Sequence, residues 1–141
     1  MAEETWFDSY VRVRYQETDQ MGVVYHANYL VWFEVGRTEL IRQLGFSYQR
    51  FEGLGFMLPV TEAHASYKKA ARYDDELIIR TKIARLEGVR LVFAYEIIRQ
   101  NDGELLASGE THHIWTSLSL KPVRLERQQP ELYAMLKQYE S

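Results

Sequence analysis

The sequence predicts an α+β fold in which a curved antiparallel five-stranded sheet wraps around one long central helix. One strongly apolar helical segment near the N-terminus, followed by four long runs rich in β-branched and aromatic residues, carries this prediction. The length of 141 residues and the hydrophobic fraction of 46% fit one packed core. We therefore expect a single domain over residues 1–141.

The first expected element is a half-buried strand at Tyr10–Gln16, where Val11 and Val13 alternate with two arginines. A loop through Thr18–Gly22 comes next. Because every second side chain of a strand points to the same face, the two valines are expected to face the core.

The central helix is expected to begin at Asn28, a suitable N-cap residue, and to run to about Leu44, where Gly45 stops it. Apolar residues cover most of its circumference, which predicts that other structure encloses it. Gly36 lies in its middle and is unfavourable there unless something packs close to the backbone.

The rest of the chain is predicted to be an antiparallel meander and a terminal helix. Glu87-Gly88 and Asn101-Asp102-Gly103 have hairpin chemistry, and Pro130 suits the first turn of a helix. The expected strands are Pro59–Lys69, Glu76–Leu86, Arg90–Arg99 and Glu104–Leu118, with the helix running to about Tyr139.

Composition excludes several classes of function. The chain has no cysteine, which rules out disulfides, thiolate nucleophiles and cysteine-bound zinc. The net charge of −3 gives no sign of nucleic-acid binding. No apolar run is long enough for membrane insertion, and the acidic segment Met1–Tyr10 does not read as a signal peptide. We expect a cytoplasmic protein.

The segment Tyr15–Tyr29 holds the densest group of candidate functional residues. It reads Tyr-x-x-Thr-Asp-x-x-Gly-Val-Val-Tyr-His-x-x-Tyr, with Asp19 and His26 as its acidic and imidazole groups. The chain resembles the 4-hydroxybenzoyl-CoA thioesterase family in this motif, and more closely its YbgC-like acyl-CoA thioesterase branch. Weaker likenesses continue at Arg37-Thr38-Glu39, Tyr73–Leu77 and Lys121–Arg124.

The resemblance implies a hotdog fold and hydrolysis of a short-chain or aryl acyl-CoA to a carboxylic acid and CoA, without a cofactor. It also implies a homodimer or homotetramer with active sites shared between subunits, which would protect the exposed sheet edges. The chain departs from the family at Lys69-Ala70-Ala71, where a proline usually precedes the alanine.

Thioester hydrolysis needs a carboxylate that attacks the carbonyl or deprotonates water, and donors for the developing oxyanion. Asp19 is the candidate carboxylate, as nucleophile or as general base. The free N–H groups of the helix start near Asn28 are candidate donors. Gly22 lets the loop backbone approach a ligand closely.

Further site residues follow from the same motif. The resemblance gives His26 the role of positioning substrate or water beside Asp19, although it also suits a polar helix start. Tyr15 is a candidate catalytic residue or a core aromatic. For the phosphates of CoA, the resemblance favours Arg90, Lys121 and Arg124. Each basic residue alone reads as a solvated charge. The full set of basic candidates is Lys68, Lys69, Arg72, Arg85, Arg90, Lys121 and Arg124.

A metal site is not expected. Glu62 and His64 share one face of a strand, but His112 and His113 point to opposite faces, and no third ligand is evident at suitable spacing.

Two alternative functions remain open. One is a hotdog acyl-thioester dehydratase or hydratase, whose Asp and His spacing Asp19 and His26 match poorly. The other is a non-catalytic module that binds acyl-CoA or an acyl carrier.

Overall fold

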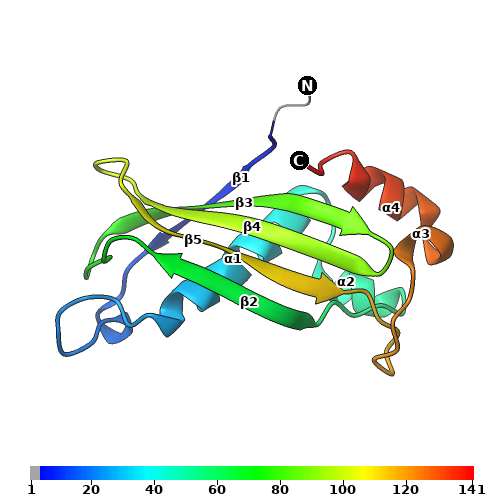
Figure 1. Ribbon diagram of the computed structural model, residues 1–141, viewed down its shortest axis with the longest axis horizontal. Coiled ribbons are helices and arrows are strands. Elements are labelled where there is room, and N and C mark those ends of the chain that lie inside the picture. The colour runs from blue at the N-terminus through cyan, green and yellow to red at the C-terminus, as the bar shows by residue number, and fades with distance from the viewer. Residues whose placement is uncertain (1–3) are drawn as a thin grey trace.

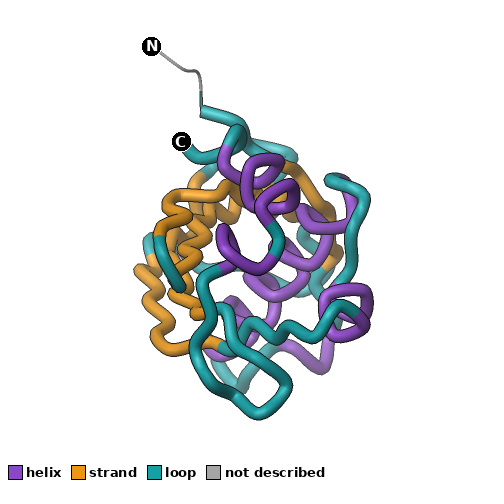
Figure 2. The backbone as a smooth tube through the Cα atoms, turned by 90° about the vertical axis from the view of Figure 1, so that its right-hand side faces the viewer, coloured by secondary structure: helices purple, strands orange, loops and turns teal. Residues whose placement is uncertain are grey.

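Helix α1 (Ala27–Gln43) and a five-stranded antiparallel sheet form the two layers of the fold. The computed structural model describes residues 4–141, so the first three residues of the predicted domain and of the Met1–Tyr10 segment lie outside the described part. Figure 1 shows α1 crossing one face of the sheet, and Figure 2 shows the strands gathered on one side and the helices on the other. This arrangement confirms the predicted sheet around a central helix.

The sheet has the strand order β1-β3-β4-β5-β2. Its strands are β1 (Phe7–Arg12), β2 (Val60–Tyr67), β3 (Glu76–Glu87), β4 (Arg90–Arg99) and β5 (Leu105–Ile114).

The prediction of a four-strand meander is therefore wrong, because β2 pairs with β5 at the far edge and not with β3. The segment after β2 is no hairpin. The backbone N–H of Lys68 donates to Leu106 O at 2.8 Å, and the N–H of Asp74 donates to Val13 O at 3.0 Å. Between these two bonds, residues 68–74 cross the end of the sheet from the β2 edge to the β1 edge.

The first strand lies earlier than predicted. It ends at Arg12, and residues Tyr15–Glu17 form a short 3₁₀ turn, η1. The buried carboxylate of Glu17 accepts a hydrogen bond from the backbone N–H of Arg14 at 2.7 Å, which turns the chain out of the sheet. Alternation of side chains does not reveal such a local contact.

The helix predictions hold in outline. Gly45 has φ +92 and ends α1 as expected, and the terminal helix α4 spans Pro130–Lys137. Two short helices, α2 (Tyr48–Gly53) and α3 (Leu125–Gln128), were not expected. The signal for α2 was Ser47, whose side chain accepts a hydrogen bond from the backbone N–H of Arg50.

The start of α1 differs from the prediction. The helix begins at Ala27 with His26 at the N-cap position and no side-chain cap. Asn28 does not cap it, because its Nδ2 donates to the carbonyl oxygen of Glu17 at 2.9 Å. The Asn28 side chain thus links η1 to the helix, and no side chain caps the backbone N–H groups at the helix start.

Close packing joins α1 to the sheet. The stacked rings of Phe33 and Tyr95 have centroids 4.3 Å apart, and both residues are buried. A Cβ atom at Gly36 would lie 2.3 Å from Thr81 Oγ1 and 2.8 Å from Ile79 Cγ2. The glycine therefore has the packing reason that its place in the helix required.

No helix in residues 4–141 combines the length and apolarity that a membrane span would need.

Candidate active site

The loop that carries Asp19 is held closed by its own hydrogen bonds. The backbone N–H of Asp19 donates to Val23 O at 2.8 Å, and the N–H of Gly22 donates to Asp19 O at 3.0 Å. One carboxylate oxygen, Asp19 Oδ1, accepts from the N–H of Met21 at 2.8 Å. Gly22 has φ +79, which glycine adopts without strain. The carboxylate is thus fixed in a tight turn, with its other oxygen available to a substrate.

The segment Lys68–Ala71 forms the opposite wall of the site. The N–H of Val24 donates to Ala71 O at 2.9 Å, and the N–H of Ala71 donates to the Tyr29 hydroxyl oxygen at 3.1 Å. Arg99 Nη2 donates to Ala70 O at 3.0 Å. These contacts hold the segment in which the sequence departs from the expected proline.

Asp19 and His26 border one cavity of about 370 Å³. Its lining comes from the loop, the start of α1 and the end of β2: Asp19, Met21, Val23, Val24, His26, Tyr29, Tyr67, Lys68, Lys69 and Ala70. The motif residues Asp19 and His26 are therefore brought together. Tyr67 was not expected here, because only the strand order places the end of β2 beside the Asp19 loop.

The imidazole of His26 is positioned by aromatic neighbours. Its ring centroid lies 4.5 Å from that of Tyr25 and 6.2 Å from that of Tyr67. The Tyr67 hydroxyl donates to the backbone carbonyl of His26 at 3.2 Å, which ties the end of β2 to the start of α1. The imidazole is exposed, so a ligand in the cavity can reach it.

The start of α1 presents backbone donors beside this cavity. Within residues 4–141, the N–H groups of His26 and Ala27 have no hydrogen-bond acceptor. Unpaired N–H groups at a helix N-terminus, together with the positive end of the helix dipole, stabilise a negative oxygen. The site thus offers a carboxylate and anion-stabilising donors.

Other predicted residues of the motif lie differently. The Tyr15 ring is 75% exposed and packs edge-on against Tyr73, outside the cavity lining. Lys69 borders the cavity, but its ammonium forms an ion pair with Glu104. The side chain of Asn28 is bonded to Glu17 O and is a support of the loop.

Arg90 and Arg124 meet at a second hollow of about 320 Å³, together with Arg85. Glu87 is the acidic residue of its lining, so positive charge is in excess there. Lys121 lies outside this lining, in the turn where its N–H donates to Ser117 Oγ at 3.3 Å. The grouping of three guanidinium groups suits a phosphate.

The turn between β3 and β4, whose residues line the arginine hollow, and the loop that precedes α1 lie at opposite ends of the sheet (Figure 1). The Asp19 loop follows the residues that pair with the start of β3, since Val13 N donates to Asp75 O. Arg90 follows the far end of β3, a strand of 12 residues. At about 3.3 Å per residue, such a strand is about 40 Å long. One chain therefore does not place both groups beside the same small ligand.

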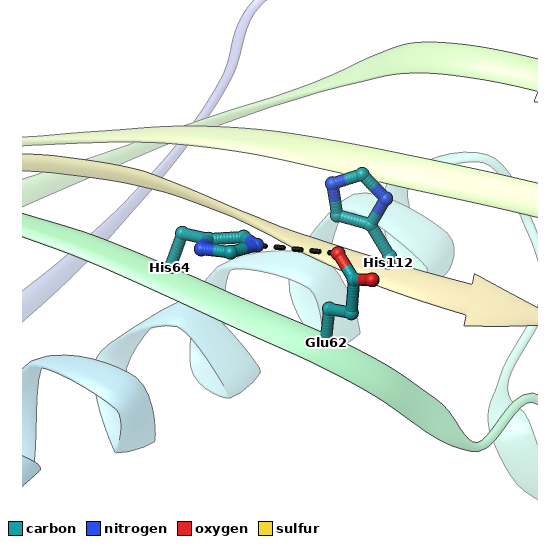
Figure 3. Close-up of side chains that lie close together, drawn as sticks. All are labelled: Glu62, His64 and His112. Carbon is teal, nitrogen blue, oxygen red and sulfur yellow. Dashed lines mark hydrogen bonds and ion pairs between the residues drawn. The ribbon is translucent and has the colours of Figure 1, made fainter.

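The expectation that Glu62 and His64 lack a third possible metal ligand nearby is wrong, because His112 lies beside them. The pairing of β2 with β5 sets His112 opposite Glu62, and the ligand atoms of the three residues lie within 4.8 Å of one another (Figure 3). Spacing along one strand missed the contact because the third residue comes from the neighbouring strand. His113 faces the core, as expected from the alternation.

Comparisons with known proteins agree with this architecture. The model of the thioesterase-like superfamily matches residues 13–136. A protein of Bacillus subtilis named "Putative acyl-CoA thioesterase YneP" is 43% identical over 86% of this chain and 88% of its own length. The acyl-CoA thioester hydrolase YbgC of Escherichia coli O6:H1 is 38% identical over 83% of this chain and 87% of its own length.

A solved structure shows the same fold at similar identity. The DHNA-CoA thioesterase of Staphylococcus aureus superposes with a TM-score of 0.88 at 37% identity, covering 94% of this chain and 89% of that chain. With the five-stranded sheet around α1 and the matching family model, this chain belongs to the thioesterase-like superfamily and has its hotdog fold.

Proposed function

We propose that this protein is an acyl-CoA thioesterase that converts acyl-CoA and water to a carboxylic acid and CoA, with Asp19 as its reacting carboxylate. The observation that carries the proposal is that Asp19 and His26 line one cavity at the start of α1, where the backbone N–H groups of His26 and Ala27 have no acceptor within residues 4–141. The relatives named as thioesterases support the choice of reaction.

The arrangement suits attack on a thioester carbonyl. A carbonyl oxygen directed at the start of α1 would receive hydrogen bonds from the two N–H groups, and these would strengthen as the oxygen gains negative charge. As general base, Asp19 takes a proton from water while the water oxygen bonds to the carbonyl carbon. As nucleophile, it forms an anhydride that water then cleaves. In both routes the C–S bond breaks and the CoA thiolate leaves and is protonated.

His26 has a positioning role in this scheme. Its imidazole borders the cavity, and the contacts with Tyr25 and Tyr67 hold it beside the donor groups of the helix start. It is placed to orient the water or the substrate carbonyl while Asp19 performs the bond-making step.

The cavity favours a small acyl group. Its volume of about 370 Å³ and the aromatic side chains of Tyr29 and Tyr67 in its lining suit a short acyl or aryl group better than a long chain.

We further propose that two chains pair β2 to β2 in antiparallel fashion, in a homodimer or a dimer of dimers. β2 is an edge strand, and its side chains are exposed on both faces apart from the half-buried Ala65. Helix α1 also exposes Leu30, Val31 and Val35. An exposed edge and an apolar helix face are the kinds of surface that association covers.

Such pairing would also bring together the Asp19 cavity and the arginine hollow, which lie far apart within one chain. Antiparallel β2 strands bring opposite ends of two sheets together, so the arginine hollow of one subunit approaches the Asp19 cavity of its partner. An extended CoA molecule could then place its thioester at Asp19 and its phosphates at Arg85, Arg90 and Arg124 of the other chain.

The decisive experiment measures thiol release from a panel of short-chain, aryl and long-chain acyl-CoAs with the native protein and with Asp19→Asn. The substitution keeps an oxygen that can accept from Met21 N–H but removes the charge, so the loop bond at 2.8 Å can persist. We expect the rate to fall by about a hundredfold or more. Gln20→Ala, an exposed neighbour in the same loop, is the matched control and should retain the native rate.

The alternative functions give different results in the same assay. A hydratase would consume enoyl-CoA without releasing thiol, and a binding module would bind acyl-CoA and leave it intact. A folded Asp19→Asn protein with the native rate would show that another group performs the reaction.

A further inference from the structure

Four polar side chains form a square on the sheet face that points away from α1. The register sets Glu62 opposite His112 and His64 opposite Glu110. Gly109, just before Glu110, faces the helix, since a Cβ atom there would lie 2.7 Å from Phe33 Cε2, and Thr111, between Glu110 and His112, is buried. Because alternate residues of a strand point to opposite faces, the four side chains share the outer face.

The side chains of Glu62, His64 and His112 converge (Figure 3). His64 Nε2 lies 3.2 Å from Glu62 Oε2, and the two imidazole centroids are 5.8 Å apart at an interplanar angle of 78°. The three groups come from two strands whose backbones are fixed by ladder hydrogen bonds. Their proximity thus follows from the sheet and does not require a flexible loop.

We infer that Glu62, His64 and His112 form a binding site for a first-row divalent transition-metal ion, with Zn²⁺ as the representative ion. Imidazole nitrogen is a preferred ligand of such ions, whereas Mg²⁺ and Ca²⁺ favour oxygen-only sites. Two imidazoles and one carboxylate make a three-ligand set, and the fourth position of a tetrahedral ion would hold water.

The distances are close to those that a metal needs. Ligand atoms bound at about 2.1 Å in a tetrahedron stand about 3.4 Å apart. The ligand atoms here lie within 4.8 Å, so closure requires a movement of about 1.4 Å at most between any pair. The side chains of Glu62 and His64 are 60% and 61% exposed and can rotate into place, while the sheet keeps their Cβ atoms in position.

Glu110 contacts His112, one of the proposed metal ligands, without being a ligand itself. Its Oε1 lies 3.2 Å from His112 Nε2, a nitrogen that is enclosed and forms no hydrogen bond of acceptable geometry. A carboxylate beside a metal-bound imidazole orients the ring, and the second ring nitrogen remains for the ion. Arg90 borders the adjoining hollow of about 280 Å³ with Glu62 and His112, and its like charge lowers the affinity expected for a cation.

The test is Zn²⁺ titration of the full chain, freed of any affinity tag and stripped with a chelator, by calorimetry and by equilibrium dialysis with metal analysis. We expect one Zn²⁺ per chain. His64→Ala and His112→Ala should each weaken binding by about a hundredfold or more, and Glu110→Gln by less, because losing an outer contact alone typically lowers affinity about 10- to 100-fold.

Two controls separate this site from other surface groups. His26→Ala removes an exposed histidine outside the cluster, and Glu96→Gln removes an outer-face carboxylate from β4. Both should bind Zn²⁺ like the native protein.

Stability gives an independent readout. Zn²⁺ should raise the midpoint of thermal unfolding of the native protein but not that of the His64→Ala/His112→Ala double variant, since a ligand stabilises only the state that binds it. Absence of stoichiometric binding to the folded native protein, or native affinity in His112→Ala, would overturn the inference.

Discussion

Gly36 of α1 and Thr81 of β3 lie so close together that a Cβ atom at residue 36 would stand 2.3 Å from Thr81 Oγ1. Thr81 is buried, and its hydroxyl forms no hydrogen bond within the described residues. The absence of a side chain at Gly36 therefore allows the central helix to approach β3 this closely.

Gly36→Ala should therefore lower the free energy of unfolding by about 1–2 kcal/mol, because overpacking outweighs the better helix propensity of alanine. Gly53→Ala is the control, since a Cβ atom there meets nothing within 4 Å. Urea denaturation of both variants measures the difference. Equal stability of the two variants would mean that α1 moves away from β3 without loss.

His26→Ala should reduce kcat less than Asp19→Asn does, because the imidazole positions a reactant and the carboxylate makes the bond. We expect a loss of about tenfold, the lower part of the range for groups that aid proton transfer or orientation. Steady-state kinetics with one acyl-CoA decide the order. Equal losses in both variants would make His26 a partner in the chemical step.

Substitutions in the arginine hollow should weaken binding of the nucleotide end of the substrate. Each of Arg90→Ala, Arg124→Ala and Arg85→Ala should raise KM several-fold with little change in kcat, since a screened ion pair contributes about 1 kcal/mol or less. Lys121→Ala should have a smaller effect, because Lys121 lies outside the lining. Added salt should weaken acyl-CoA more than a truncated thioester without the nucleotide.

Mixing two defective proteins tests whether the hollow serves the partner's site. One parent carries Asp19→Asn, and the other carries the three arginine substitutions. If sites are shared, dissociated and reassociated mixtures should regain activity at low substrate, up to about a quarter of the native level for random pairing into two-fold dimers. Activity equal to the average of the parents would assign the hollow to its own chain or to another role.

The buried His113 should make stability depend on pH. Burial lowers its pKa from 6.5 to about 4. Its Nδ1 faces Leu58 O at 3.2 Å and so carries the proton, while Nε2 lies 2.8 Å from Thr111 Oγ1 and accepts from it. The folded state therefore holds the neutral imidazole.

The sign of the pH effect follows from proton uptake. Between pH 6.5 and about 4 the unfolded chain binds a proton at His113 that the folded chain does not. Above this window His113 does not change the free energy of unfolding with pH. As the pH falls through the window, proton uptake by the unfolded chain lowers the free energy of unfolding by about 3 kcal/mol in total. His113→Gln should show a correspondingly shallower loss in urea titrations over this window. Parallel curves for both proteins would contradict the assignment.

The sequence alone determined the kinds of elements and the reacting group to test. The apolar helix around Gly36, the run Arg90–Arg99 and the hairpin glycines Gly88 and Gly103 all appear where local pattern places them. These features depend on residues near one another in the chain, which is why periodicity and turn chemistry suffice. The motif around Asp19 was recognised by its resemblance to a thioesterase family, and its loop is closed locally by the bond from Asp19 N–H to Val23 O.

Tertiary structure decided which distant segments meet. Pairing of β2 with β5 moved Tyr67 to the Asp19 cavity and set His112 opposite Glu62. Pairing of β3 with β4 sets Arg90 opposite Glu87, at the end of β3 away from the Asp19 loop. Strand order is set by the burial of whole faces against α1 and by crossing segments such as Lys68–Asp75, and neither leaves a local periodic signal. For that reason the sequence pointed to Asp19 and His26 as candidates but not to their neighbours across the strands.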